Sequence, residues 1–455
     1  MKFLRKNPFV LYCGIIGICF LYTGSAYMSE YYRLMPHYDG VMIDVITSVI
    51  FYLFQALGIG VFSFGLYKKP EIFKKRKLFV ILLATGAVFM FLGQFLKDPV
   101  LLTLFSCIFQ LHIGVYFGYY LAMLGQNVPV RNSGLCYGIA YAIGTVGTYL
   151  FSLVDNGNFF ESRSIAVVYL ALALVTALLV VCAEDLLPEG KTEDTKPETR
   201  GIGVGTELTY LIPIVTLIML ITSIGSGLYY SLPQAEDVNW NLIRTAYAIG
   251  LIAAGFIMDR SRLVGEICAI ASLAYPLIAL ALINDGVNNT LALSMSYVCR
   301  GFISVYYIIV FTDISWRNKK LLPLAPLGLL VSRFSEALFS LILLSVNIPQ
   351  VVQMILTTVS FVPLLLLFVM YQIKKNLPAP APVTTDALVT SFASTYKLTA
   401  REAEVLECMA DGLTDDEIAE KCYISRNTVR FHVSNIFKKT GLTSRTEVIR
   451  SLKRQ

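Results

Sequence analysis

The chain has 455 residues, of which 56% are hydrophobic and 15% are charged; its mean hydropathy is +0.65 and its formal net charge is +6. An ordinary soluble domain carries about 25% charged residues, and a disordered chain combines low hydrophobicity with high charge. The composition therefore excludes both classes for the chain as a whole and favours a membrane protein.

Twelve apolar runs follow one another along most of the chain. A helix crosses a bilayer with about 20 predominantly apolar residues. The sequence therefore predicts an all-α fold, a polytopic bundle of twelve transmembrane helices in a lipid bilayer, with spans near 8–27, 40–67, 78–96, 99–126, 134–154, 164–183, 208–232, 240–258, 263–283, 290–315, 321–346 and 349–373. The first run resembles a signal peptide, but it is longer than a typical signal core, and we interpret it as an uncleaved helix.

Basic residues between the spans predict the orientation of this multi-pass bundle. Twenty Lys and Arg residues lie in the two terminal segments and the loops on the same side, against three on the opposite side: Arg33, Lys97 and Arg163. Basic loops stay in the cytoplasm, so both termini are expected to be cytoplasmic.

A polar linker, 184–207, divides the spans into two groups of six, a layout typical of two-halved transporter bundles. The loop Gly255-Phe-Ile-Met-Asp-Arg-Ser-Arg262 resembles the inter-helix signature of the major facilitator superfamily, whereas the corresponding Gly65-Leu-Tyr-Lys-Lys-Pro70 lacks its Asp. The resemblance implies a major-facilitator-like membrane domain over 1–376, with halves 1–183 and 208–376.

Polar residues inside the spans are candidates for a ligand site, because an ionisable side chain in a bilayer is costly and by default functional. Aromatic and polar groups around an apolar cavity suit a small organic ligand, anionic or aromatic if Arg300 faces it. The candidates are Gln110, His112, Tyr116, Tyr229, Arg300, Tyr306, Arg333 and Glu336.

A structural role is the alternative for each of these candidates. Tyr side chains often anchor a helix at the membrane interface. Arg333 and Glu336, three residues apart on one helical face, could form a structural ion pair. A single His such as His112 could be hydrogen-bonded packing.

The composition changes after the last span. Leu377-Pro-Ala-Pro-Ala-Pro382 opens a linker, 377–396, and we expect this Pro-rich run to be stiff and extended because repeated Pro disfavours helix. From about 384 charged residues alternate with apolar residues at helical spacing, and 397–455 is predicted to be a separate domain.

Four short helices are predicted in this domain. Thr399 and Thr414 each begin a capping box. Ser425 can cap a third helix that ends at Gly441, and a fourth helix follows. Two helices joined by a tight break at 422–424 are typical of a helix-turn-helix module.

The third helix has an inward and an outward face. The apolar residues that recur at helical spacing, and are expected in the core, are Val429, Val433, Ile436 and Phe437. On the outward side Arg can pair with guanine, while Asn, Ser and Lys can reach bases or phosphates. The residues expected to contact DNA are Ser425, Asn427, Thr428, Arg430, Phe431, Ser434, Lys438, Lys439 and Arg445.

Five segments of this domain resemble the LuxR-type DNA-binding domain: Leu398-Thr-Ala-Arg-Glu-Ala-Glu-Val-Leu406, Gly412-Leu-Thr414, Glu417-Ile-Ala-Glu420, Ile424-Ser-Arg-Asn-Thr-Val-Arg-Phe-His-Val433 and Lys438-Lys-Thr-Gly-Leu-Thr-Ser-Arg445. The resemblance covers almost all of 397–455 and implies a recognition helix at about 425–440. It also implies a homodimer, formed through the fourth helix, on a double-stranded DNA operator at a bacterial cell membrane, with RNA polymerase as a further partner. Phe431 departs from the smaller or polar residue common in such domains, which leaves the base preference open.

Other chemistry has no support in the sequence. Nine Cys are scattered without a Cys-x-x-Cys pair, no His cluster suits zinc, and no phosphate-binding loop or nucleophile motif is found. We therefore expect no cofactor, no metal site and no enzymatic activity.

The sequence thus predicts a membrane-bound transcriptional regulator whose bundle senses a small molecule and changes the spacing or pairing of two DNA-binding domains. The alternative is a secondary transporter whose tail regulates its own gene. Proton or sodium coupling usually needs buried carboxylates, and the spans offer few besides Glu336 and Asp44, which favours the sensor.

Overall fold

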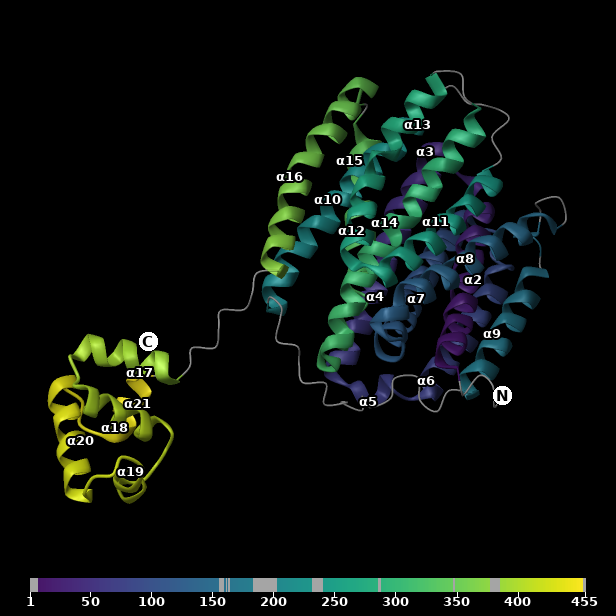
Figure 1. Cartoon of the computed structure of the whole chain (residues 1–455). Helices are drawn as coiled ribbons and strands as arrows, with labels where there is room; N and C mark the ends of the chain where they lie inside the picture. The colour runs from purple at the N-terminus through teal and green to yellow at the C-terminus, as the bar shows by residue number, and fades with distance from the viewer. Residues whose placement is uncertain are drawn as a thin grey trace. The chain divides into compact units, whose positions relative to one another are not determined.

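The computed structural model describes residues 7–154, 159–160, 162, 164–182, 203–230, 240–284, 288–346, 348–376 and 385–452. Their regular structure is helical throughout (Figure 1), as the sequence predicts. The chain forms two compact units, one running as far as Lys375 and the other containing the residues from Asn376 onward.

The first half of the membrane unit contains the first six predicted spans, all of them helical. Pro8 and Pro99 stand in the first turn of their helices, where the missing proline N–H has no helical partner to lose. Asp98 caps the second of these helices by accepting from the Leu101 N–H. The elements are α2 (Pro8–Leu34), η1 (Met35–His37), α3 (Gly40–Asp44), η2 (Val45–Ile50), α4 (Phe51–Lys68), α5 (Pro70–Phe73), α6 (Arg76–Gly93), α7 (Pro99–Asn127), α8 (Val130–Ser152) and α9 (Ser164–Cys182).

The second half contains the remaining six predicted spans. Ser261 and Asn288 cap α12 and α14, because their side-chain oxygens accept from backbone N–H groups in the first turn. The elements are α10 (Val204–Tyr230), α11 (Trp240–Arg260), α12 (Arg262–Ala271), η4 (Ser272–Ala274), α13 (Tyr275–Asn284), α14 (Asn289–Arg317), η5 (Lys319–Leu324), α15 (Leu327–Ser345) and α16 (Gln350–Asn376).

The chain is a multi-pass membrane protein, but the number of its spans stays a prediction. Each of the twelve predicted spans overlaps a helix of the structure. Within the described ranges, nine helices are long and apolar enough to cross a bilayer, and α9 contains a shorter apolar stretch. The polytopic all-α fold is confirmed, whereas the count of twelve is not.

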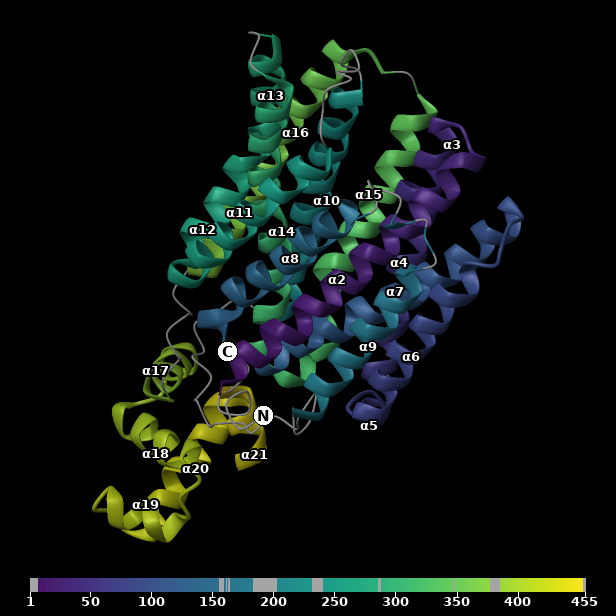
Figure 2. The ribbon, with the colours of Figure 1, turned by 90° about the vertical axis from the view of Figure 1, so that its right-hand side faces the viewer.

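Glycines let the helices of the bundle approach closely. A Cβ on Gly250 of α11 would lie 1.9 Å from the carbonyl oxygen of Val298 in α14. The helix α8 of the first half packs along α11 of the second (Figure 1, Figure 2), where a Cβ on Gly138 would lie 2.3 Å from the carbonyl oxygen of Leu251. Small residues therefore bring the helices into backbone contact, and Gly138 does so between the two halves.

Five helices enclose the core of the second unit: α17 (Thr385–Tyr396), α18 (Ala400–Ala410), α19 (Asp415–Lys421), α20 (Arg426–Thr440) and α21 (Arg445–Leu452). The capping boxes predicted at Thr399 and Thr414 are both present. Ser425 caps α20, and Gly441 ends it in the left-handed conformation, with φ of +71°. The buried apolar residues include Val405, Leu406, Met409, Ile418, Val429, Ile436, Val448 and Leu452.

The second unit begins earlier than the predicted domain boundary at 397. Residues 385–396 form the helix α17, whose Val389 and Phe392 are buried in the same core as α18 and α21. The prediction placed 385–396 in the linker, because the packing of α17 on α18 and α21 depends on residues outside this segment. Residues 377–384 lie outside the described ranges, as does the predicted inter-half linker from 184 to 202.

Candidate functional site

A cavity of ≈ 340 Å³ lies at the centre of the membrane unit. Its walls come from α2, α4, α7 and α8 of the first half and from α10, α11, α14 and α15 of the second. The lining is unusually rich in tyrosine, with Tyr27, Tyr52, Tyr120, Tyr137, Tyr141, Tyr149, Tyr247, Tyr297 and Tyr307. Each ring offers an apolar face and a hydroxyl, so the cavity suits a small organic molecule with polar substituents.

Three ionisable candidates from the sequence line this cavity: Arg300, Arg333 and Glu336. The predicted pair is present, with Nη1 of Arg333 at 3.4 Å from Oε2 of Glu336. The Arg333 guanidinium also lies 4.3 Å from the ring centroid of Tyr52, a cation–π geometry. Arg300 donates from Nε to the Tyr275 hydroxyl at 2.9 Å.

Two polar atoms of the lining have hydrogen-bonding capacity left over. Within the described part of the chain, Nε of Arg333 and Oε1 of Gln55 are buried without a hydrogen-bond partner. A buried polar group without a partner is costly. Nε of Arg333 can donate to a ligand and Oε1 of Gln55 can accept from one, and the charge balance of two Arg against one Glu favours a ligand that carries negative charge.

The other sequence candidates do not line the cavity. Gln110 reaches it only indirectly, by accepting from Nε2 of Gln55 at 2.6 Å. His112 and Tyr116 lie among aromatic rings contributed by α2, α6 and α7. They were misplaced because α7 is enclosed on several sides, so a polar residue on it can face a neighbouring helix instead of the cavity. The Tyr229 side chain lies outside the described residues.

Tyr307, and not the predicted Tyr306, lines the cavity. The cavity-facing residues of α14 are Tyr297, Arg300, Ile303, Ser304 and Tyr307. Relative to Arg300, the last three stand at i+3, i+4 and i+7, which share one face of a helix, whereas i+6 does not. Taking Arg300 as the reference would have found Tyr307 from the sequence.

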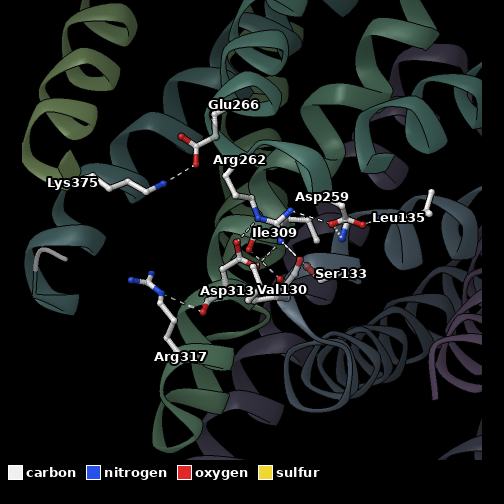
Figure 3. A network of polar contacts seen from close by, with 12 residues as sticks. Val130, Ser133, Leu135, Asp259, Arg262, Glu266, Ile309, Asp313, Arg317 and Lys375 are labelled. Carbon is white, nitrogen blue, oxygen red and sulfur yellow. Dashed lines mark hydrogen bonds and ion pairs between the residues drawn. The ribbon is translucent and has the colours of Figure 1, made fainter. Parts of the chain in front are cut away.

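A second polar cluster joins the two halves where α11 ends and α12 begins (Figure 3). Both carboxylate oxygens of Asp259 accept backbone N–H groups of the first turns of α8, from Gly134 and Leu135 at 2.8 Å each. The N-terminal end of a helix is partly positive and binds an anion well. Asp259 of the second half therefore holds α8 of the first.

Arg262 occupies the centre of this cluster. Its Nε donates to Oδ2 of Asp313 in α14 at 2.8 Å, and its Nη2 donates to Oγ of Ser133 at 2.8 Å (Figure 3). It also lies 3.2 Å from Oδ1 of Asp259. The guanidinium fork thus ties α8, α11 and α14 together, as its fixed planar geometry allows.

The cluster continues to the end of α16, the helix that precedes the second unit in the chain. Nζ of Lys375 lies 2.9 Å from Oε1 of Glu266, which also accepts from Gln372. Arg317 binds Glu207 through both carboxylate oxygens, at 2.7 and 2.8 Å, and the Tyr371 hydroxyl donates to the same carboxylate. The carboxylates of Glu207 and Glu266 are buried.

Sequence reasoning missed these two carboxylates. Glu266 is an acidic residue at the start of the ninth predicted span, which is a sufficient signal under the rule that intramembrane charges are functional candidates. Glu207 fell at the edge of the predicted linker, although the structure places it in the first turn of α10.

In the second unit, α19 and α20 form the predicted helix-turn-helix. Val429 and Ile436 of α20 are buried against the core. The opposite face is open to solvent and includes Ser425, Asn427, Arg430, Phe431, Ser434 and Lys438. Thr428 is half-buried, and its N–H donates to the Ser425 hydroxyl as part of the cap. The predicted split into inward and outward faces agrees with this structure, while the DNA contacts themselves stay predictions.

Two of the predicted phosphate-binding residues have partners within the domain. Lys439 donates to Oε2 of Glu402 at 2.6 Å, and Arg445 donates to Asp415 at 3.3 Å. Burial alone would raise the pKa of Glu402, but hydrogen bonds from Lys439 and Thr399 outweigh it and hold the pKa below its ordinary value. Arg430 lies 3.6 Å from the same Asp415. Among the described residues, no group of three His, Cys, Asp or Glu side chains is arranged to hold a metal ion.

The C-terminal domain matches known bacterial proteins. The model of the family "Bacterial regulatory proteins, luxR family" matches residues 396–452. The spore germination protein GerE of Bacillus subtilis (strain 168) is 41% identical over 63 residues, which cover 14% of this chain and 85% of GerE. The transcriptional regulatory protein DegU of Brevibacillus brevis is 49% identical over 57 residues, 12% of this chain and 24% of DegU. The match thus spans about a quarter of DegU.

The membrane unit resembles a solved transporter fold. A crystal structure of a major facilitator superfamily transporter, FucP, in the outward conformation aligns with a TM-score of 0.52. The alignment covers 83% of this chain and 100% of FucP at 12% identity. A second crystal structure, of a variant of the E. coli fucose:proton symporter FucP, aligns over the same shares of both chains with a TM-score of 0.51. The predicted major-facilitator-like fold is confirmed, and this similarity concerns the fold alone.

Proposed function

Because this chain belongs, through residues 396–452, to the luxR family of bacterial regulatory proteins, we propose that it is a membrane-bound transcriptional regulator that senses a small molecule. The observation that carries the proposal is the union in one chain of a luxR-family DNA-binding domain and a major-facilitator fold with a polar cavity lined by both halves. The protein acts by binding, without an enzymatic reaction.

DNA binding requires the C-terminal domain to lie in the cytoplasm. The distribution of basic residues, twenty on the side of both termini against three on the other, supports this orientation. The operator is double-stranded DNA, read by α20 in the major groove. Two chains pair through α21 on a two-fold operator, and RNA polymerase is a further partner.

The polar cluster supports a route from the bundle to the DNA-binding domain. Major-facilitator halves rock against one another around a central site. Here Asp259 and Arg262 contact α8 across the halves, and Arg262 also holds Asp313 of α14. Glu266 of α12 binds Lys375, and Glu207 of α10, which Arg317 of α14 also contacts, binds Tyr371, so these buried carboxylates hold the end of α16. A ligand that shifts the halves would therefore shift the last helix before the DNA-binding domain.

The ligand class follows from the cavity. Two guanidinium groups against one carboxylate leave a positive balance, and the tyrosine rings favour a flat apolar body. A small aromatic carboxylate combines both properties. Benzoate, with its neutral analogue benzamide as control, is a suitable probe for this class in a thermal-shift assay of the purified protein.

In that assay benzoate should raise the melting temperature of the wild type, because a ligand stabilises the state that binds it. The shift should be lost in Arg300→Met and retained in Arg260→Met, since Arg260 stacks on Phe256 outside the cavity. Equal shifts by benzoate and benzamide would contradict the anionic class.

DNA binding is tested by sequencing the DNA that crosslinks to the tagged protein in cells and measuring affinity for the recovered sites. Arg430→Ala should weaken binding to these sites by about 1–3 kcal/mol while changing binding to random DNA less. If the tagged protein enriches no sequence, it is not a sequence-specific DNA-binding protein.

The alternative function is a secondary transporter whose tail regulates its own gene. One observation favours it: Glu30 of α2 is fully buried beside Arg33 and the hydroxyl of Ser106, and buried carboxylates can carry protons in transporters. Uptake of a labelled probe such as benzoate into proteoliposomes separates the two functions, because flux supports transport, whereas binding without flux supports sensing.

A further inference from the structure

Two large hydrophobic side chains are exposed among the described residues of the second unit: Tyr423 with 95% and Phe431 with 62% of its surface in solvent. Tyr423 lies in the turn before α20, where its hydroxyl can hydrogen-bond to solvent water. Phe431 lies on α20 itself and has no polar atom in its side chain. Single exposed apolar residues are common on folded domains, so it is the position of Phe431 on α20 that points to a partner.

The charge of α20 points to the nature of this partner. The helix contains four basic residues, Arg426, Arg430, Lys438 and Lys439, and no Asp or Glu. Such a helix suits a polyanion and would repel most basic protein surfaces. The basic charge of this face therefore favours the DNA duplex of the proposed function.

Phe431 stands at the middle of the outward face. Asn427 and Ser434 lie four residues before it and three after it, so the three side chains share one side of the helix. Val429 and Ile436 are buried on the other side. In a helix-turn-helix, residues in the N-terminal part of the recognition helix reach the base edges, and Phe431 is the sixth residue of α20.

The apolar side chain limits what Phe431 can read. In the major groove adenine, guanine and cytosine present hydrogen-bonding groups, whereas thymine adds a methyl group at C5. Phe can exclude water from this methyl group but cannot satisfy a polar edge. We propose that Phe431 is a specificity-determining residue that recognises a thymine through its 5-methyl group, an inference that rests on the proposed DNA-binding function.

The contact with the thymine methyl group is assigned to Phe431 and not to its neighbour Arg430. Arg430 lies 3.6 Å from Asp415 of α19, and Arg426 lies 3.2 Å from Asp416. The ring contact of Phe431 is with His432, the next residue, at 5.8 Å between centroids. Arg430 and Phe431 therefore present a cation and an apolar ring side by side, which suits a thymine adjacent to a guanine.

Uracil tests the proposal, because it pairs like thymine but lacks the methyl group. The full-length protein in lipid nanodiscs is used to select duplexes from a random pool, and each thymine of the selected sequence is then replaced singly by uracil. Removing one buried methyl group corresponds to about a fourfold loss of affinity. We expect this loss at one thymine per recognition helix for the wild type.

Phe431→Ala should abolish the difference between thymine and uracil at that position, while Phe431→Leu, which keeps an apolar side chain, should retain it. Tyr423→Ala is the matched control, since it removes the other exposed aromatic residue and should leave the fourfold effect intact. Thermal melting of each variant shows that it is folded, as the exposure of both side chains leads us to expect.

The outcomes separate this inference from the function on which it rests. If no sequence is enriched from the pool, the proposed DNA-binding function fails. If a sequence is enriched but the wild type tolerates uracil at every position, or if Phe431→Ala keeps the wild-type sensitivity, the role of Phe431 is refuted and the DNA-binding function stands.

Discussion

The ion pair between Lys375 and Glu266 should anchor the end of α16, and its removal gives a quantitative test. The Glu266 side chain is 2% exposed, whereas that of Lys375 is 35% exposed. Breaking a fully buried pair costs about 3–5 kcal/mol, and a surface pair contributes about 0–1 kcal/mol. For this half-exposed geometry we expect Lys375→Met to lower the local stability of the last turn of α16 by about 2 kcal/mol.

The assay is amide hydrogen exchange, followed by mass spectrometry, on the full-length protein in lipid nanodiscs. A loss of about 2 kcal/mol should speed exchange in the last turn of α16 about 30-fold, because exchange of a locally opening helix follows its opening free energy. Lys374→Met is the matched control, since Lys374 is the exposed neighbour on the same helix. It should leave the exchange rate unchanged.

The double variant Glu266→Gln with Lys375→Met completes the test. Replacing both members of a buried pair by neutral groups removes the uncompensated charge, so most of the lost protection should return. If Lys375→Met exchanges like the wild type, or like Lys374→Met, the pair does not anchor α16. If the double variant exchanges as fast as Lys375→Met, the effect is not electrostatic.

Three further predictions concern packing, pH and backbone conformation. Gly250→Ala should lower the melting temperature of the membrane unit by the equivalent of about 1–3 kcal/mol, because the added Cβ would lie 1.9 Å from the Val298 carbonyl oxygen. Gly60→Ala is the control and should leave the melting temperature unchanged, because its Cβ would lie 3.8 Å from the nearest atom, Cδ1 of Leu330. The pKa of Glu402 is held below its ordinary value of 4.5. The ionised Glu402 therefore stabilises the folded domain above pH 4.5, and this stabilisation is lost as pH falls through the lowered pKa. Glu402→Gln removes the titrating group and should flatten the acid dependence of hydrogen exchange in α18. Gly441→Ala should raise exchange at the end of α20 by the equivalent of about 1–2 kcal/mol, purely through its φ of +71°, since a Cβ there meets nothing within 4 Å.

Local features were predictable because they depend on a few neighbouring residues. The capping boxes at Thr399 and Thr414 need only a Thr and a Glu three residues later. The pair Arg333–Glu336 needs only helical spacing. The outward face of α20 follows from its apolar residues, because a helix with one buried side must expose the other.

Features that depend on distant partners were not predictable in the same way. Asp259 binds the N–H groups of Gly134 and Leu135, more than 120 residues away. The helix α17 was assigned to the linker because its contacts with α18 and α21 are not visible in its own residues. His112 was assigned to a ligand site because its polarity is visible in the sequence, whereas its aromatic neighbours are not.

The sequence by itself determined that this is a polytopic helical membrane protein, because hydropathy acts over one helix at a time, and the motifs of 397–455 resemble the luxR-type domain. Only the tertiary structure decided which polar residues of those helices share a cavity, and that α16 is held at its end by buried carboxylates of α10 and α12. The physical reason is that each of these properties depends on the rotation of one helix against another, which is set by packing between residues far apart in the chain.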